Sequence, residues 1–170
     1  MTCSVGFRAP AAGELARELL VRLADEDADP ALYRDPAQAA TATPAAVPAA
    51  LEDFARRALQ RHLAHPLALA RALGEVLSEP KPKVWFEARD AVPAAAGALR
   101  LDARTRMMYD AHHVFINGES FLARGRDARL LREMADTQVL TAVQRRQLSP
   151  SAQSLLEDWL SAGWLHGDER

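Results

Sequence analysis

The sequence predicts an α+β protein in which a helical region precedes a small mixed domain. Leucines recur at helical spacing between residues 11 and 77, and the pattern changes to strand-like alternation after a proline-rich segment at 79–83. An Asn-Gly pair at 117–118 separates two short apolar runs, which is typical of a β-hairpin. A final helix then reaches Gly163 and leads into another apolar pair, so the second region is of the winged-helix type.

Residues 1–10 have the pattern of one β-strand followed by a stop. Small or polar residues alternate with apolar ones from Ser4 to Phe7, and Pro10 interrupts the alternation. A strand needs partners, because an unpaired strand leaves its backbone donors and acceptors open. The segment that follows is helical in pattern and offers no second strand. We therefore expect residues 1–10 to be the last strand of a preceding domain, and the chain to be the C-terminal part of a larger protein.

Residues 11–25, 49–63 and 67–77 predict three amphipathic helices. The intervening residues 26–48 are acidic and then rich in alanine and proline, which predicts an irregular connection anchored by Tyr33. The apolar side chains of the helices form either a core within the chain or a dimer interface. The expected interface residues are Leu15, Leu19, Leu23, Leu51, Phe54, Leu59, Leu73 and Leu77.

The polar segment 79–83, with its spaced prolines, marks the expected boundary between a helical region at 11–79 and a second domain at 80–170. Strands of the second domain are expected at 99–101, 105–109, 114–116, 119–122 and 164–165. Helices are expected at 127–134, at 140–146 and from Ser149 onward. Gly163 is placed to end the last helix in the left-handed conformation.

The opening heptapeptide Ser-Val-Gly-Phe-Arg-Ala-Pro at 4–10, followed by Glu14-Leu15 and by Tyr-Arg-Asp-Pro at 33–36, resembles the bacterial ribosomal oxygenases. Segments 73–78, 114–119 and 160–165 agree with that family in their order. Its members are cupin-fold, JmjC-type protein hydroxylases that use iron(II) and 2-oxoglutarate. The resemblance implies that residues 1–10 close the cupin barrel, that 11–79 form a helical dimerisation region, and that 80–170 form a winged-helix domain. It covers nearly the whole chain but only the C-terminal half of the family's architecture.

The resemblance also implies that this chain lacks the catalytic site. The family binds iron through His-x-Asp or His-x-Glu and a later histidine, all of which precede the motif at Ser4. The one such match here, His166-Gly167-Asp168, stands at the chain end with no histidine after it, so we expect no metal site. Ser4 is a candidate contact for the 2-oxoglutarate carboxylate only in an intact barrel, and Arg8 suits a strand-end salt bridge or an anionic group. The chain alone is therefore expected to hold no cofactor and to have no catalytic residues.

The remaining histidines and the single cysteine suggest no further chemistry. His112-His113 is expected in a solvated hairpin loop, and His62 and His65 flank a helix break. Cys3 is the only cysteine, which excludes an internal disulfide and fits a reducing cytoplasm. Apolar runs are shorter than the ~20 residues of a membrane helix, so no membrane association is expected.

Nucleic-acid binding is not expected from the charge, because the chain carries a net charge of −2. Acidic residues are interleaved with the arginines at 124, 126, 129 and 132, and Arg145-Arg146 forms a smaller patch. Two functions stay open. The first is the dimerisation and winged-helix portion of a 2-oxoglutarate-dependent ribosomal protein hydroxylase, with a homodimeric state and a ribosomal protein substrate for the whole enzyme. The second is a free-standing winged-helix nucleic-acid-binding or adaptor protein.

Overall fold

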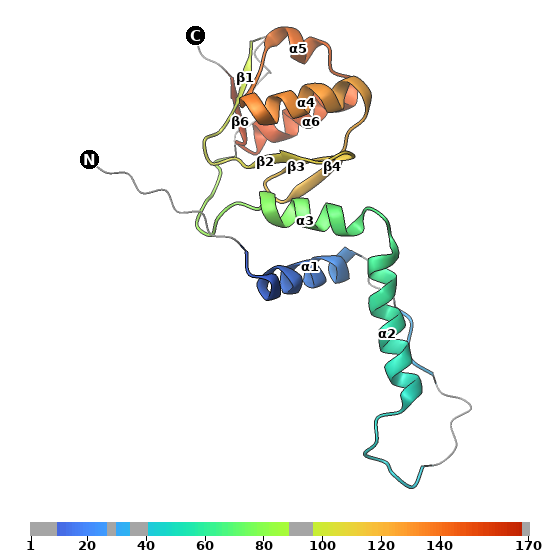
Figure 1. Cartoon of the computed structure of the whole chain (residues 1–170). Helices are drawn as coiled ribbons and strands as arrows, with labels where there is room; N and C mark the ends of the chain where they lie inside the picture. Colours follow the sequence, from blue (N-terminus) through green and yellow to red (C-terminus); the bar gives the residue numbers. More distant parts are fainter. Residues whose placement is uncertain (1–9, 27–29, 35–40, 89–96, 168–170) are drawn as a thin grey trace. The chain divides into compact units, whose positions relative to one another are not determined.

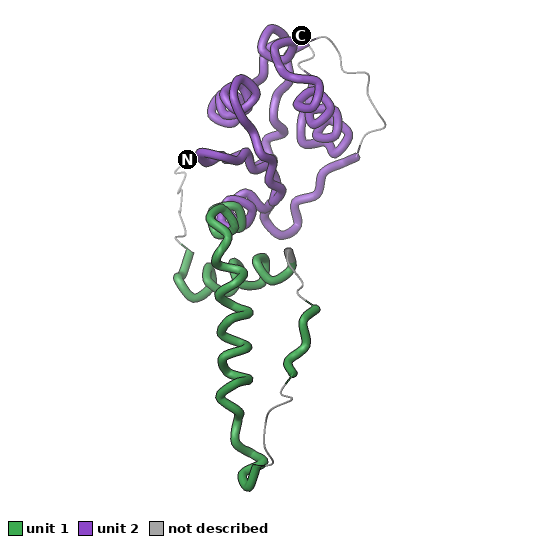
Figure 2. The backbone as a smooth tube through the Cα atoms, turned by 90° about the vertical axis from the view of Figure 1, so that its right-hand side faces the viewer, with its two compact units in different colours: residues 1–72 green, residues 73–170 purple. Residues whose placement is uncertain are grey.

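The computed structural model describes residues 10–26, 30–34, 41–88 and 97–167 (Figure 1). The chain divides into two compact units, residues 1–72 and residues 73–170, which Figure 2 shows in two colours. The strand expected at residues 1–10 lies outside the described residues, apart from Pro10. The division between the units falls between Ala72 and Leu73, inside a helix, whereas the sequence suggested a boundary after residue 79.

The three expected N-terminal helices are confirmed, each to within about one residue at either end. They are α1 (Ala12–Glu26), α2 (Ala49–Ala64) and α3 (Ala68–Ser78). In the first unit, Leu23 of α1 is 3% exposed and packs with Ala68, Ala72 and Leu19. By contrast, α2 has no buried residue at all. On the polar face of α2, Arg56 forms ion pairs with Glu52 and Asp53 at helical spacing, and these pairs stabilise the helix.

The second unit contains two small antiparallel sheets, each of three strands. One sheet has the order β2-β3-β4, formed by β2 (Met107–Tyr109), β3 (His113–Ile116) and β4 (Glu119–Leu122). The other has the order β5-β1-β6, formed by β5 (Val139–Leu140), β1 (Leu99–Leu101) and β6 (Leu165–Gly167). The helices are α4 (Gly125–Thr137), α5 (Ala142–Arg146) and α6 (Pro150–Ser161).

The predicted hairpin is confirmed, with β3 and β4 joined by Asn117 and Gly118. Both turn residues have positive φ, 49° and 90°, as a type I′ turn requires. The Asn117 side chain accepts a hydrogen bond from the backbone N–H of Arg106 at 2.9 Å, which ties the turn to the start of β2. The turn type matches the right-handed twist of the strands, so the local sequence alone sets this hairpin.

Helices α4 and α6 cover one face of the β2–β4 sheet (Figure 1). Val114 and Ile116 of β3 are fully buried on this face, and the ring of Trp159 on α6 lies 5.5 Å from that of Phe121 on β4. Because side chains alternate along a strand, Phe115 and Ser120 point to the opposite face. There they meet Gly74 and Glu75, from the part of α3 that belongs to the second unit.

The end of α6 shows how the expected Gly163 turn works. Gly163 has φ of 74°, its N–H bonds to Leu160, and the N–H of Trp164 bonds back to Trp159 at 2.9 Å. This pair of bonds is a Schellman motif, which satisfies the last carbonyls of the helix. The chain then turns directly into β6, so a final short strand is present as predicted, although it covers 165–167 rather than 164–165.

One helix prediction was wrong at its start. Residues 140–146 were expected to be helical, but Leu140 lies in β5, pairs with Leu99 and is fully buried. Helix α5 begins only at Ala142, after Thr141, whose side chain accepts from the N–H of Gln144 while the Gln144 side chain accepts from the N–H of Thr141. This capping box fixes the helix start more strongly than the apolar spacing on which the prediction relied.

Candidate functional site

The side chains expected at a dimer interface differ widely in exposure. In the first unit Leu23 belongs to the chain's own core, whereas Leu51 is 38% and Leu59 is 59% exposed on α2. Phe54 is half-buried, with its ring 5.7 Å from that of Tyr33, so Tyr33 is an anchor as expected. The α2 side chains, with neighbouring Leu63 at 52% exposed, are thus the part of the predicted interface that is open to a partner.

Two of the expected interface residues belong to the second unit. Leu73 is half-buried, and Leu77 is 39% exposed. Leu77 lines a pocket of about 290 Å³ together with Met107 and Met108 of β2 and with Ala135 of α4. The structure therefore gives Leu77 a setting that its helical spacing did not indicate.

A set of hydrogen bonds holds the end of α3 to the hairpin. The Ser78 hydroxyl donates to the carbonyl of Glu75 at 3.2 Å and accepts from the N–H of Gly118 at 3.1 Å. The Ser120 hydroxyl donates to the Glu75 carboxylate, and the Arg106 guanidinium donates to the carbonyl of Glu79 at 2.9 Å. The sequence did not predict the contacts of Ser78 with Gly118, Glu75 with Ser120 and Arg106 with Glu79, because these partners lie 27 to 45 residues apart and leave no local pattern.

Two of the arginines of α4, Arg129 and Arg132, have partners within the domain. Arg129 lies 3.6 Å from Glu133 on the same helix. Arg132 donates to the carbonyl of Ala111 at 2.9 Å, and its guanidinium carbon lies 5.7 Å from the centre of the Tyr109 ring. The interleaved Asp127 accepts from the N–H and hydroxyl of Ser149, the residue whose side chain caps α6 by accepting from the N–H of Ala152. Arg132 and Asp127 thus contribute to the domain's own packing, whereas Arg124 and Arg126 are exposed.

The adjacent histidines have different environments, and the expectation of a solvated loop was wrong for one of them. His113 is 4% exposed in β3, and its ring lies 5.6 Å from that of Phe115. Asp110 accepts from the backbone N–H groups of His112 and His113, both at 2.6 Å. Burial raises the pKa of the Asp110 carboxyl, but these backbone donors and the His113 ring outweigh it and leave the pKa below its ordinary value. His112 is exposed, as expected.

His166 has a carboxylate partner that the sequence did not suggest. Its Nε2 lies 2.6 Å from Asp102, in the turn after β1, and Asp102 also accepts from the Arg104 side chain at 2.8 Å. The hydrogen bond from Arg104, and then that from His166, hold the pKa of Asp102 well below its usual range. Arg104 further donates to the carbonyl of Trp85 at 3.0 Å. The cluster thus joins β6, the turn after β1 and the segment that follows α3.

The residues expected near a cofactor are mostly not described. Cys3, Ser4 and Arg8 fall in residues 1–9, and Asp168 falls in residues 168–170, all outside the described part. Among the described residues, no three His, Cys, Asp or Glu side chains come together in a way that could hold a metal ion. Of the two histidines beside the helix break, His65 caps α2 and is exposed, whereas His62 is half-buried near the end of α2. In the described part of the chain, no helix has the length and apolar character needed to cross a membrane.

The second unit matches a known family of winged-helix domains. A model of the ROXA-like winged helix matches residues 61–166, which is more than half of the chain. The chain belongs to the ROXA-like winged helix family. The matched range contains α3 and the described elements of the second unit, except for the last residue of β6, so the predicted winged-helix type is confirmed for that region.

Solved structures extend this likeness of fold beyond the ROXA-like winged helix itself. The structure of Escherichia coli YcfD matches with a TM-score of 0.71 and 22% sequence identity, covering 95% of this chain and 46% of that one. The YcfD ribosomal oxygenase from Escherichia coli in complex with cobalt and 2-oxoglutarate matches with a TM-score of 0.73 and 22% identity, covering 96% of this chain and 48% of that one. The chain therefore spans about half the length of these relatives. A search of curated proteins gave no significant match.

Proposed function

We propose that the chain is the helical and winged-helix portion of a ribosomal oxygenase, and that it serves assembly of that enzyme rather than its chemistry. The observation that carries this proposal is the family match over residues 61–166, together with a fold likeness to YcfD over 95–96% of the chain. For the whole enzyme we propose 2-oxoglutarate-dependent hydroxylation of a ribosomal protein in the cytoplasm, with iron(II) as the metal. The YcfD complex with cobalt and 2-oxoglutarate supports such a cofactor set.

The described residues do not fit an iron site. Iron(II) oxygenases of this kind need two histidines and a carboxylate that converge on one point. His166 has one carboxylate, Asp102, but that carboxylate is already bound by Arg104. Since no third ligand converges among the described residues, we propose that iron(II) and 2-oxoglutarate bind elsewhere in the full enzyme and that this chain is not catalytic alone.

Dimerisation is the second element of the proposal, and the exposure of α2 supports it. A helix that buries none of its residues while carrying Leu51, Leu59 and Leu63 leaves an apolar stripe in water. Burying one such side chain is worth roughly 1.5–3 kcal/mol. A second copy of the same stripe covers it symmetrically in a two-fold dimer. We propose the helical region as that interface, with the exposed leucines of α2 at its centre; Leu23, which lies in the chain's own core, does not contribute to it.

Two measurements on the purified 170-residue chain test this function. Sedimentation at micromolar concentration should show a dimer, and an assay of 2-oxoglutarate turnover with added iron(II) should show none. A monomer across the whole concentration range contradicts the dimerisation element. Turnover by the chain alone contradicts the non-catalytic element, and micromolar binding to duplex DNA or RNA with a steep salt dependence points instead to a nucleic-acid-binding protein.

A further inference from the structure

The open edge of the β2–β4 sheet has the features of a peptide-binding surface. In the part of the chain that the structure describes, β2 pairs only with β3 and so forms one edge of its sheet. The N–H of Asn117 bonds to Arg106 and the N–H of Asp110 bonds to His113, so residues 106, 108 and 110 direct their backbone groups toward β3. By the alternation of an antiparallel pair, Met107 and Tyr109 direct their N–H and C=O groups to the open edge.

The pocket of about 290 Å³ lies at this same edge. Met108 stands opposite Phe115, whose ring contacts Gly74 of α3, so Met108 faces the α3 side of the sheet. Met107 packs into the main core, on the side of α4. A pocket lined by both methionines, by Leu77 of α3 and by Ala135 of α4 draws on both faces of the sheet. It can do so only beside the β2 edge.

The size and lining of the pocket suit one anchoring side chain. Its volume is at the lower limit, about 300 Å³, of pockets that hold drug-sized molecules. Leu77 is 39% and Met108 is 41% exposed, so apolar surface stays in contact with water there. An aliphatic side chain of an added strand would cover this surface while its backbone pairs with β2, the mode by which an extended peptide joins a sheet edge.

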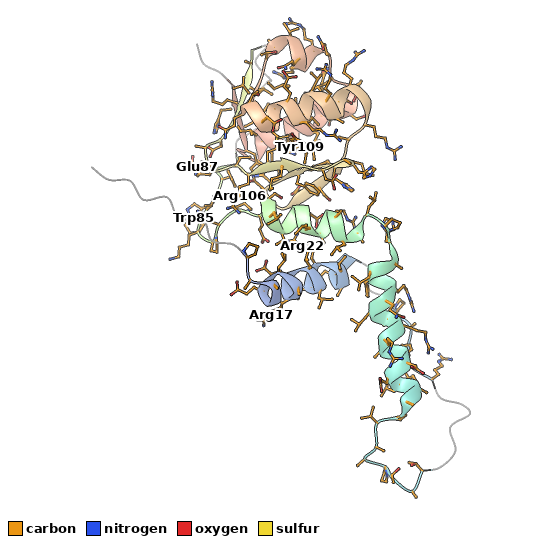
Figure 3. The ribbon with its side chains drawn as sticks, in the orientation of Figure 1. Arg17, Arg22, Trp85, Glu87, Arg106 and Tyr109 are labelled. Carbon is orange, nitrogen blue, oxygen red and sulfur yellow. The ribbon has the colours of Figure 1, made fainter. Side chains whose placement is uncertain are left out.

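The charges around β2 differ between its two ends. At the start of β2, Arg106 lies at the pocket, and its side chain and that of Arg104 bind the carbonyls of Glu79 and Trp85. The segment 79–87 carries exposed Lys81 and Lys83 as well as Glu79 and Glu87, so with Arg104 and Arg106 the cations exceed the glutamates there. Figure 3 shows Arg106 and Trp85 on the same side of the second unit. At the other end, the Tyr109 hydroxyl donates to Asp136 at 3.0 Å, Asp110 follows Tyr109 in the chain, and the Arg132 guanidinium lies 5.7 Å from the centre of the Tyr109 ring. A strand that pairs antiparallel with β2 places its C-terminal end near the cations.

We propose that β2 and its pocket bind an extended protein segment in which an aliphatic anchor is followed by acidic residues. Backbone pairing with Met107 and Tyr109 supplies the hydrogen bonds, the pocket between Leu77 and Ala135 holds the anchor, and Arg106, Lys81 and Lys83 pair with the acidic end. This surface lies within the second unit and does not depend on the proposed oxygenase role.

The test uses a fluorescent peptide, acetyl-Thr-Val-Leu-Val-Glu-Asp-amide, titrated with the full 170-residue chain in a fluorescence-anisotropy assay. Saturable binding below ~1 mM is expected. Two versions methylated at alternate backbone nitrogens distinguish strand pairing from simple charge attraction, since one set of N–H groups faces β2 and the other faces water. One version should lose binding and the other keep it. A peptide with the acidic pair moved to its N-terminal end should bind more weakly.

Variants of the chain locate the surface. Lys81→Glu with Lys83→Glu should weaken binding about five- to tenfold, since each exposed ion pair contributes little by itself. Ala135→Leu, which fills the pocket, should weaken binding without changing the circular dichroism spectrum. Arg124→Glu with Arg126→Glu makes the same charge change at exposed residues of another element and should leave binding unchanged.

Absence of saturable binding, equal loss from both methylation patterns, or equal effects of the two charge-reversal pairs overturns the proposal. Competition between the peptide and self-association of the chain also overturns it, because the edge would then be occupied by a second copy.

Discussion

The hydroxyl of Ser78, at the end of α3, accepts a hydrogen bond from the N–H of Gly118, in the hairpin turn 40 residues later. Ser78 is fully buried and also donates to Glu75 within its own helix. One side chain thus connects the last turn of α3 to the turn between β3 and β4. Together with the bond of Ser120 to Glu75 and the contact of Phe115 with Gly74, it joins residues 73–78 to the second unit, although they continue a helix of the first.

Ser78→Ala should destabilise the second unit by about 1–3 kcal/mol, since it leaves the Gly118 N–H without this acceptor in a buried site. Urea denaturation followed by tryptophan fluorescence measures the change. Ser154→Ala removes a hydroxyl from an exposed position of α6 and should cost far less. Equal midpoints for wild type and Ser78→Ala would show that the bond is not needed.

Gly74→Ala should destabilise the second unit by roughly 1–3 kcal/mol through overpacking. A Cβ at residue 74 would overlap the ring of Phe115, whereas a Cβ at Gly13 of α1 meets nothing within 4 Å. Gly13→Ala is therefore the control and should raise helix stability by up to about 1 kcal/mol. The double variant Gly74→Ala with Phe115→Leu should recover part of the loss, and failure to recover any would place the strain elsewhere.

Asp102 should make stability depend on acid pH. Because Arg104 and His166 hold its folded pKa below the unfolded value of about 3.9, its contribution is complete above that value and is lost as the pH falls below it. Asp102→Asn should lower the free energy of unfolding at pH 7, and the difference from wild type should narrow between about pH 4 and pH 2. Asp158→Asn, at an exposed position of α6, controls for the change of charge. A difference that stays constant with pH would contradict this role.

Leu59→Glu should shift the chain from dimer to monomer, weakening association at least about tenfold, because a charge would replace an apolar contact in the proposed interface. Leu59 is 59% exposed, so the substitution should not disturb folding of the single chain. Leu122→Glu changes a 66% exposed leucine of β4 and should leave sedimentation unchanged. Equal sedimentation of all three proteins would exclude α2 from the interface.

Residues close together in the sequence account for the features that could be predicted. The spacing of leucines predicted α1, α2 and α3, and Asn117-Gly118 predicted the β3–β4 turn, because helix and turn formation depend on neighbours within a few residues. Gly163 was predicted to end α6 for the same reason. The capping box of Thr141 and Gln144 could also have been recognised in the sequence, and it would have corrected the predicted start of α5 from residue 140 to residue 142.

Only the tertiary structure decided which of these elements meet. The burial of His113, the partnership of His166 with Asp102 and the tie between Ser78 and Gly118 join residues whose contacts are set by how sheets and helices pack. The open edge of β2 and its pocket arise in the same way, from Leu77 and Ala135 on two different helices. The sequence determined the local conformations and the order of the regions, because these follow from short-range sterics and periodicity. Long-range contacts have no signature in a single sequence, since many partners are chemically equivalent until the chain has packed.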